Sequence, residues 1–497
     1  MPNIEFEITP IEEASDAILE SIKKYFLKDL DDDFIDPQIE ADIGNYLDEL
    51  KEGLYCLVEY PYVDKVYRDS YYNYYSSKHY TYQRDCIRVS LFASEIKPKD
   101  FLNPSKHKKL NEIYLGYFII RPTTNALFGR SIINPIAFEK NDFKICKCKT
   151  NNLVYGVKLE TEGFPHSSQD GETIKCAETT IWALMEYFGN KYPEYRPTLP
   201  ATIIKSLDRI TYQRLLPSNG LTMNQISFAL KEFGFGTRIY SSTPYDKTIN
   251  NIIDCYVESG IPVLTGLESE NTGHVIITIG KKYSKKITWN KIPKSTYSKE
   301  GKEISYFDTT NFPAKYVIQD DNLEPYRLIE LNKPGEHYED DDSQGYYIDS
   351  IIVPLYPKIY LEAVVAKELL IQIIKDNKVG YNFSNNFVFR FFLASSRSFK
   401  NHISQLKDMA DGLKYSILAS KMPKFIWCGE FYTKEGYQNA DKESIGLVIL
   451  DATEANQASI DALIFAGYPD RCISMIENNF ATLQYQFEKY RYYSNLK

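Results

Sequence analysis

The chain has 497 residues, of which 43% are hydrophobic and 25% are charged. This is the composition of an ordinary globular protein, and it excludes long disorder, collagen-like repeats and a disulfide-dense mini-protein. The 58 basic and 67 acidic residues give a formal net charge of −9, which argues against nucleic-acid binding over a broad basic face. At about 100–200 residues per domain, the length predicts two to four domains.

Residues 1–155 are predicted to form an N-terminal α+β domain. Ile18, Ile22 and Phe26 give the apolar stripe of a first helix. Asp36 and Pro37 fit the N-cap and the first position of a second helix. Strand-like runs follow at Leu54–Tyr60, Cys86–Ala93 and Ile113–Arg121.

Tyrosine is over-represented, with 41 residues, and many of these lie between Val66 and Asp85. We interpret this segment as a partly ordered surface loop. The alternative is a Tyr-rich binding surface.

Residues 156–355 are predicted to form a middle domain in which helices precede strands. A helix over Cys176–Phe188 should end at Gly189, and Thr222 with Gln225 forms the capping box of another. A third helix is expected near Ile249–Glu258, with strands at Ile261–Gly266, Val275–Ile279, Tyr316–Gln319 and Tyr346–Pro354. The Lys-rich stretch from Lys281 to Thr310 reads as an inserted hairpin or loop.

Residues 356–497 are predicted to form a C-terminal α+β domain, and the acidic run Glu339–Asp342 is the best linker candidate before it. A long helix should begin near Ile359, and further helices are expected near Phe399–Leu413. Strands are expected at Lys424–Glu430 and Ile445–Asp451. We interpret five polar residues of this segment as structural: Arg390, Ser395, Ser396, Glu430 and Asp451.

The start of the chain, MPNIEFEITPIEEAS, lacks the basic and apolar regions of a secretory signal. No stretch reaches about 18 uninterrupted apolar residues, so no membrane span is predicted. The eight cysteines are scattered, which without an export signal indicates free thiols in a reducing compartment. Cys146 and Cys148 lack further ligands at zinc spacing. We therefore expect a cytoplasmic protein with no cofactor and no metal.

Cys176 is the cysteine best placed for chemistry. It opens an amphipathic helix, where unpaired backbone N–H groups and the helix dipole favour the reactive thiolate. Only six histidines are present, and His274 lies between a glycine and the apolar run Val-Ile-Ile-Thr-Ile, at the start of a buried strand. Such an imidazole can accept the thiol proton and return it to a leaving group. His166 is the only rival.

A base of this kind is usually oriented by a third group. Asp320, at the end of a predicted strand, is the first choice for this carboxylate, with Asp321 and Asp308 as alternatives. Gln169, seven residues before Cys176, could donate to an oxyanion together with the backbone N–H of Cys176.

The run from Gln169 through CAETTIWALMEYFG resembles the nucleophile helix of papain-like cysteine peptidases, closest to the C39-like branch. GLTMNQISFALKEFGF, GIPVLTGLESENTGHVIITIG and YVIQDDNLEPY resemble further segments of that branch, over residues 160–355. The resemblance implies a papain-like core. In it Cys176 is the nucleophile, His274 the base, Asp320 the orienting carboxylate and Gln169 the oxyanion-hole residue.

The expected function is hydrolysis of a peptide or isopeptide bond in a protein or peptide substrate. No nucleic-acid or membrane partner is expected, and the flanking domains could bind a protein partner. Two alternatives remain open. One is a transglutaminase-like or other acyl-transferring thiol enzyme, because fold does not fix function. The other is a catalytically degenerate peptidase domain that serves as an interaction scaffold.

Overall fold

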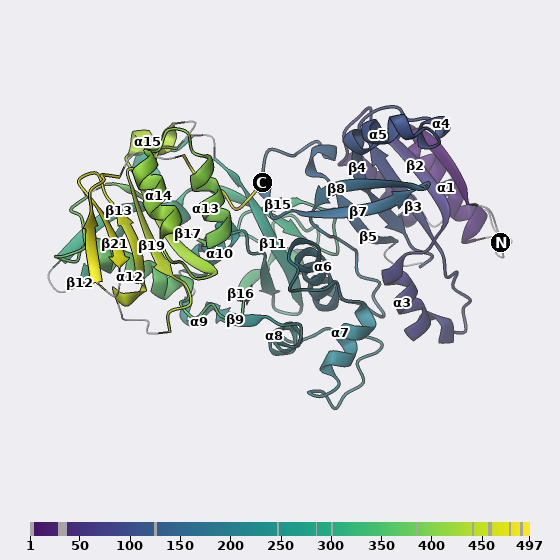
Figure 1. Ribbon diagram of the computed structural model, residues 1–497. Coiled ribbons are helices and arrows are strands. Elements are labelled where there is room, and N and C mark those ends of the chain that lie inside the picture. Colours follow the sequence, from purple (N-terminus) through teal and green to yellow (C-terminus); the bar gives the residue numbers. More distant parts are fainter. Residues whose placement is uncertain are drawn as a thin grey trace.

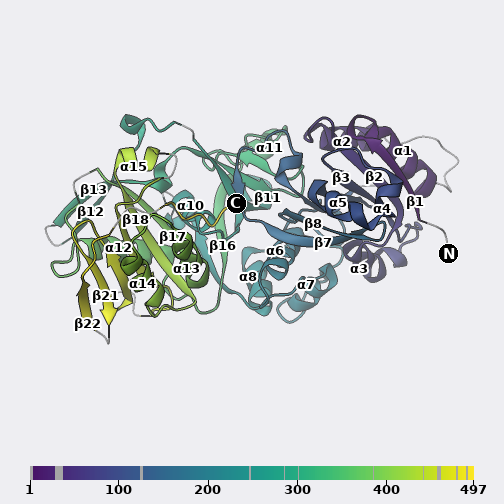
Figure 2. The same cartoon turned by 45° about the horizontal axis from the view of Figure 1, so that its top comes forward.

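The computed structural model describes residues 4–27, 37–123, 127–245, 248–284, 286–299, 302–383, 386–439, 442–455, 460–476, 479–487 and 491–497. The protein is a mixed α+β structure with three large sheets that follow one another along an elongated molecule (Figure 1). The turned view in Figure 2 shows the same order, with the N-terminal sheet at one end and the C-terminal sheet at the other. The α+β class predicted from the sequence is confirmed.

The N-terminal sheet is antiparallel and has apolar clusters on both faces. Its strand order is β1 (Glu5–Pro10), β2 (Tyr55–Tyr62), β3 (Cys86–Phe92), β4 (Tyr114–Ile120) and β5 (Phe128–Ile133). Around it lie α1 (Ala14–Tyr25), α2 (Pro37–Asp48), α3 (Lys65–Asn73), α4 (Pro98–Phe101), α5 (His107–Ile113) and the hairpin of β7 (Cys148–Val154) and β8 (Val157–Gly163). Side chains alternate along β2, so Cys56 and Val58 pack with α1 and α2 while Leu57 packs with α5 and the hairpin.

The middle sheet carries the predicted site. Its order is β15 (Arg327–Ile329), β14 (Ala314–Gln319), β11 (Gly273–Tyr283), β10 (Val263–Glu268), β16 (Tyr347–Leu355) and β9 (Gly236–Ser241), and β6 (Lys144–Ile145) also pairs with β11. Its helices are α6 (Cys176–Lys191), α7 (Pro200–Leu207), α8 (Met223–Glu232), α9 (Ser242–Tyr245), α10 (Ile249–Glu258) and α11 (Asp341–Gln344). Helix α6 is buried on almost every side because it lies between β11 and β7.

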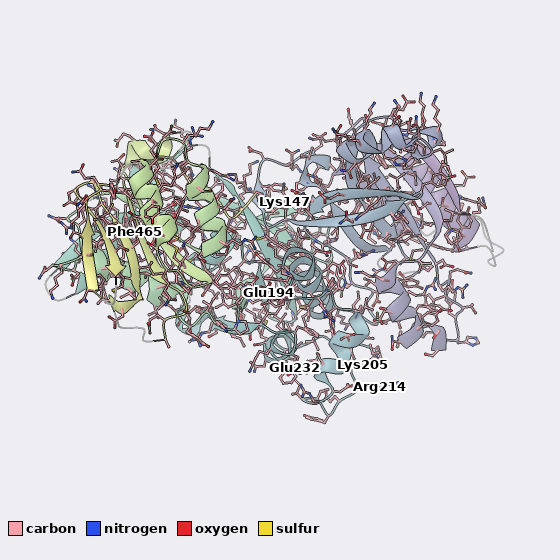
Figure 3. All side chains as sticks on the ribbon, in the orientation of Figure 1. Lys147, Glu194, Lys205, Arg214, Glu232 and Phe465 are labelled. Atoms are coloured by element: carbon pink, nitrogen blue, oxygen red, sulfur yellow. The ribbon has the colours of Figure 1, made fainter. Side chains whose placement is uncertain are left out.

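The helices α7 and α8 form a projection beside the middle sheet. Figure 3 labels Lys205, Arg214 and Glu232 on this projection, together with Glu194 nearer the sheet. Helix α7 also contacts α3, so the projection joins the N-terminal lobe to the middle one.

The C-terminal sheet takes two strands from the middle of the chain. Its order is β12 (Ser295–Lys299), β13 (Lys302–Asp308), β17 (Val388–Ser395), β18 (Phe425–Tyr432), β19 (Gly446–Asp451), β20 (Leu463–Gly467), β21 (Cys472–Ile476) and β22 (Asn479–Leu483). Helix α12 (Ala363–Ile374) packs on one face, and α13 (Ser396–Gln405) and α14 (Asp411–Ala419) pack on the other, with α15 (Lys434–Gln438) near β18. The pairing of β13 with β17 is parallel, whereas the other strand pairs are antiparallel.

A buried ionic network joins the middle and C-terminal sheets. The Glu258 carboxylate of α10 accepts from Lys281 of β11 at 2.8 Å and from Arg390 of β17 at 2.8 Å. Arg390 also pairs with Glu430 of β18 at 2.7 Å. Buried charges are tolerated when they are paired and hydrogen-bonded in this way, and these contacts fit the prediction that Arg390 and Glu430 are structural.

Most predicted elements are confirmed. Helix α6 begins at Cys176, and the capping box of α8 forms, with Gln225 N–H donating to Thr222 Oγ1 at 3.3 Å and Thr222 N–H to Gln225 Oε1 at 2.8 Å. The Lys-rich insertion contains the predicted hairpin, β12 and β13, but it extends the C-terminal sheet. The predicted N-cap Asp36 lies outside the described residues.

The helices predicted near Phe399–Leu413 are present as α13 and α14. Two predictions about the chain's breaks are wrong. The acidic run Glu339–Asp342 forms the start of α11, where Asp342 accepts from Ser269 and Asn271, so it packs on the middle sheet and is no linker. Gly189 lies inside α6 and does not end it. A Cβ at this position would come within 2.4 Å of Pro197, so the glycine allows close packing of the following loop against the helix.

None of the helices in the described ranges is both long enough and apolar enough to cross a bilayer.

Glycine 189 gives a test of this packing. Gly189→Ala should lower the free energy of unfolding by about 1–3 kcal/mol, because the added methyl group meets the backbone nitrogen and ring of Pro197. Gly44→Ala in α2 is the matched control, since nothing lies within 4 Å of its added Cβ, and it should be neutral or stabilising by up to about 1 kcal/mol. Urea unfolding of both variants measures the difference. Equal effects would contradict the proposed packing constraint.

Candidate functional site

The loop before Cys176 is shaped by the buried carboxylate of Asp170. Asp170 Oδ1 accepts from the backbone N–H groups of Glu172, Thr173 and Ile174 at 3.0, 2.6 and 2.9 Å. A carboxylate that accepts from the next residues' N–H groups fixes a turn. This turn therefore fixes the path of the backbone into Cys176, the first residue of α6.

Helix α6 and strand β11 contact each other near their N-terminal ends. The hydroxyl of Thr180 lies 2.5 Å from the backbone oxygen of Cys176 and 3.4 Å from that of Val275. Val275 directly follows His274, so this contact places the helix start beside the strand start. Cys176 is partly exposed, whereas the other seven cysteines are buried.

The structure brings Cys176, His274 and Asp320 together. His274 Nε2 lies 2.9 Å from Asp320 Oδ1, and the Cys176 side chain interacts with the same imidazole. Because Nε2 faces the carboxylate, Nδ1 is the ring nitrogen that remains for the thiol. Asp320 follows β14, which is paired to β11, so its position at a neighbouring strand end is the one predicted.

Asp320 is fully buried and has partners on every side. Its Oδ1 accepts from the N–H of Asn322 at 3.0 Å, and its Oδ2 accepts from the hydroxyl of Tyr338. His337 Nε2 lies 3.8 Å from the same Oδ2. His166 Nε2 lies 2.9 Å from the Asp320 backbone oxygen. In the tautomer that carries its proton on Nε2, the His166 ring donates a hydrogen bond to this oxygen. The rival histidine of the sequence analysis thus supports the aspartate and does not face Cys176 through this nitrogen.

Asp321 also reaches the imidazole. Its Oδ1 lies 3.8 Å from His274 Nε2, no hydrogen bond of ordinary geometry reaches either carboxylate oxygen from the described residues, and the Thr179 side chain has only a small effect on the carboxylate. The residue is 6% exposed. Burying a carboxylate that lacks strong hydrogen bonds is unfavourable. Asp321 is therefore expected to lower the stability of the folded protein.

These contacts set the charge states. Burial alone would lower the pKa of His274, but the carboxylates of Asp320 and Asp321 and the Cys176 thiol hold it well above its ordinary value. Burial would raise the pKa of Asp320, but His274 and the bonds from His337 and Tyr338 hold it below its ordinary value. Burial and the charge of Asp320 raise the pKa of Asp321 to about 7, against the opposing effect of His274. For His166, burial lowers the pKa, which favours a neutral ring.

The other predicted residues occupy different places. Gln169 lies next to the Asp320–Asn322 turn: its side-chain amide donates to Asn322 Oδ1, and its backbone N–H donates to Asp321 O at 3.3 Å. The Asp308 side chain has other partners than His274. It accepts from Thr310 in the turn after β13 and pairs with Lys367.

Sequence reasoning missed two tyrosines beside the base. Tyr346 stacks near His274 with ring centroids 6.2 Å apart, and Tyr338 lies edge-on at 6.3 Å while it binds Asp320. They lie on either side of the acidic run Glu339–Asp342, the linker candidate, and Tyr346 begins a predicted strand. A His-Tyr pair beside this acidic run was the only available signal, and it is a weak one.

One group of side chains in the described ranges has the geometry to hold a metal ion. One atom from each of His274, Asp320 and Asp321 lies within 4.8 Å of the others. All three side chains are buried.

No protein-family model matches the chain, and a search of curated proteins finds no match.

The unpartnered carboxylate of Asp321 predicts an unusual dependence of stability on pH. Its pKa is raised from 3.8 to about 7, so the folded protein holds a proton that the unfolded chain loses, and stability falls as pH rises from about 4 to about 7. Asp321→Asn should therefore be more stabilising at pH 8 than at pH 4, by up to about 4 kcal/mol. Urea unfolding at both pH values, in the presence of a chelator, measures this. An equal effect at both would show that the carboxylate has a partner.

Proposed function

We propose that the protein is a cysteine peptidase that hydrolyses a peptide or isopeptide bond, with Cys176, His274 and Asp320 as its catalytic triad. The observation that carries the proposal is the imidazole of His274, held at Nε2 by Asp320 while it interacts with the thiol of Cys176. A catalytic triad of this kind consists of a nucleophile, a base and an orienting group. Cys176, His274 and Asp320 would fill these roles in that order. The resemblance of residues 160–355 to papain-like peptidases of the C39-like branch agrees with it.

The acylation step follows from these positions. His274 Nδ1 takes the proton of Cys176, and the sulfur attacks the carbonyl carbon of the scissile bond. The backbone N–H of Cys176 and the amide of Gln169 would bind the oxyanion, for which Gln169 must turn from Asn322. The C–N bond then breaks, His274 gives the proton to the departing amine, and a thioester remains on Cys176.

The second step decides between hydrolysis and transfer. When water attacks the thioester, His274 accepts its proton, the C–S bond breaks, and a free acid leaves. When an amine attacks, the product is an amide, as in a transglutaminase-like reaction. Product analysis separates the two, and a scaffold with a degenerate site would give neither product.

The Tyr-rich segment contacts the loop that leads to Cys176, which supports a role for the N-terminal lobe in substrate binding. Thr173 Oγ1 donates to Ser70 Oγ of α3 at 3.0 Å, and Lys78 pairs with Glu172 at 2.5 Å. Tyr72 and Tyr80 are 60% and 45% exposed. Exposed tyrosines offer large, rigid contact surfaces to a peptide.

Thiol labelling tests the base. In the wild type, Cys176 should react with iodoacetamide at pH 6, because His274 holds the thiol proton. Exposure alone would also favour Cys176, so the informative comparison is with His274→Gln, which should label at least about tenfold more slowly at pH 6 but approach the wild-type rate at pH 9. Mass spectrometry of tryptic peptides gives both rates. Equal rates at pH 6 would rule out His274 as the base.

Turnover tests the third residue. Asp320→Asn should lower kcat on a peptide-library substrate by about 10³–10⁴ without unfolding the protein, because the imidazole loses its orienting carboxylate. Asp308→Asn, normalised to folded protein, should keep its activity because Asp308 binds Thr310 and Lys367. Full activity in Asp320→Asn, with loss in Asp321→Asn, would instead assign the orienting role to Asp321.

A further inference from the structure

We propose that His274, Asp320 and Asp321 form a binding site for a divalent transition metal ion of the zinc type. The three residues supply one imidazole nitrogen and two carboxylate oxygens, which are common zinc ligands in proteins. The binding site does not depend on the proposed peptidase activity, although its effect on turnover does.

The distances agree with such an ion. His274 Nε2 lies 2.9 Å from Asp320 Oδ1 and 3.8 Å from Asp321 Oδ1. Ligand atoms about 2.0–2.2 Å from a tetrahedral ion lie roughly 3.4 Å apart. The three ligand atoms all lie within 4.8 Å of one another, so shifts of up to about 1.4 Å would convert the observed cluster into a coordination shell.

The two oxygens of Asp321 are the independent observation. They are buried, no hydrogen bond of ordinary geometry reaches them in the described part of the chain, the Thr179 side chain affects them only weakly, and Oδ1 faces the same nitrogen as Asp320. The only ion pair that the described residues give Asp321 is the one with His274. Two buried carboxylates thus face one imidazole, and a divalent cation would balance their charge.

The carboxylate of Asp320 is already oriented for coordination. Asp320 Oδ2 is held by the Tyr338 hydroxyl, which leaves Oδ1 directed at His274. Hydrogen bonds of this kind to a ligating carboxylate orient it and support metal affinity. Gly273, just before His274, is exposed, and Cys176 is partly exposed, so the cluster lies close to the surface.

Metal binding and catalysis would exclude one another, an effect that rests on the proposed function. A metal-bound imidazole nitrogen must be unprotonated, so binding sends the Nε2 proton to solvent. The neutral ring then keeps only the Nδ1 proton taken from Cys176 and has lost its hydrogen bond to Asp320, so it is a weaker acid toward the departing amine. The ion would act as a reversible inhibitor of the thiol site.

The test is titration of the metal-free, full-length protein with Co²⁺ at pH 7.5, followed by visible absorption. We expect one equivalent to give the absorption of protein-bound Co²⁺ and Zn²⁺ to displace it. Asp321→Asn and Asp321→Ala should weaken binding at least about tenfold. Asp349→Asn, which changes a half-buried carboxylate of β16 outside the cluster, should leave it unchanged. Thermal unfolding with chelator present confirms that each variant is folded.

The outcomes separate the two proposals. Absence of the visible absorption, or binding that both Asp321 variants retain, would overturn the metal site. Binding that depends on Asp321, in a protein whose Cys176 labelling does not depend on His274, would keep the metal site and remove the peptidase. A fully active enzyme saturated with Zn²⁺ would overturn the mutual exclusion.

Discussion

The site depends on one buried carboxylate. Asp320 contacts His274 through one oxygen and Tyr338 through the other, and its backbone oxygen is bound by His166. Removing a carboxylate from water is unfavourable unless hydrogen bonds and an opposite charge replace the solvent. The residues around Asp320 supply both, and they do so from three separate stretches of the chain. The position of the imidazole is therefore fixed by the same contacts that keep this charge inside the protein.

The environment of Asp321 differs from that of its neighbour in sequence. Hydrogen bonds join the Asp320 carboxylate to His274, Asn322 and Tyr338, whereas none of ordinary geometry reaches the Asp321 carboxylate from the described residues. Burial raises the pKa of both carboxyls, but His274 and the hydrogen bonds to Asp320 outweigh burial there, so the pKa of Asp320 lies below its ordinary value and that of Asp321 lies above it. Groups whose environments separate their pKa values in this way are concentrated at functional sites. The buried carboxylate of Asp321 lowers the stability of the folded protein. Residues that do so commonly have a role other than folding.

The sequence predicted the local features of the site well. A cysteine at the first position of an amphipathic helix, a histidine at the start of an apolar run and an aspartate after a strand are signals that lie within a few residues of the side chain concerned. Their meeting depends on the pairing of β11 with β14, which the order of elements made plausible. The orienting carboxylate could not be chosen between Asp320 and Asp321 from sequence, because the two differ only in which side of the chain they face.

Long-range contacts were beyond prediction. Tyr338 and Tyr346 flank the acidic run Glu339–Asp342, whose composition is typical of a linker, and only the folded chain shows that Asp342 binds the loop before His274. The interior position of Gly189 depends on Pro197, eight residues away on the following loop. Periodicity and capping patterns describe one element at a time, so they do not contain this information.

The hairpin of β12 and β13 changes how the two larger sheets are connected. The chain leaves the middle sheet after β11, contributes β13 to the C-terminal sheet beside β17, and returns to form β14. It crosses between the sheets again after β16. A single proteolytic cut between β16 and α12 would therefore leave the two sheets attached through the hairpin. For the same reason, the C-terminal sheet is not a simple appended module, because its inner strand β13 is encoded between β11 and β14 of the middle sheet.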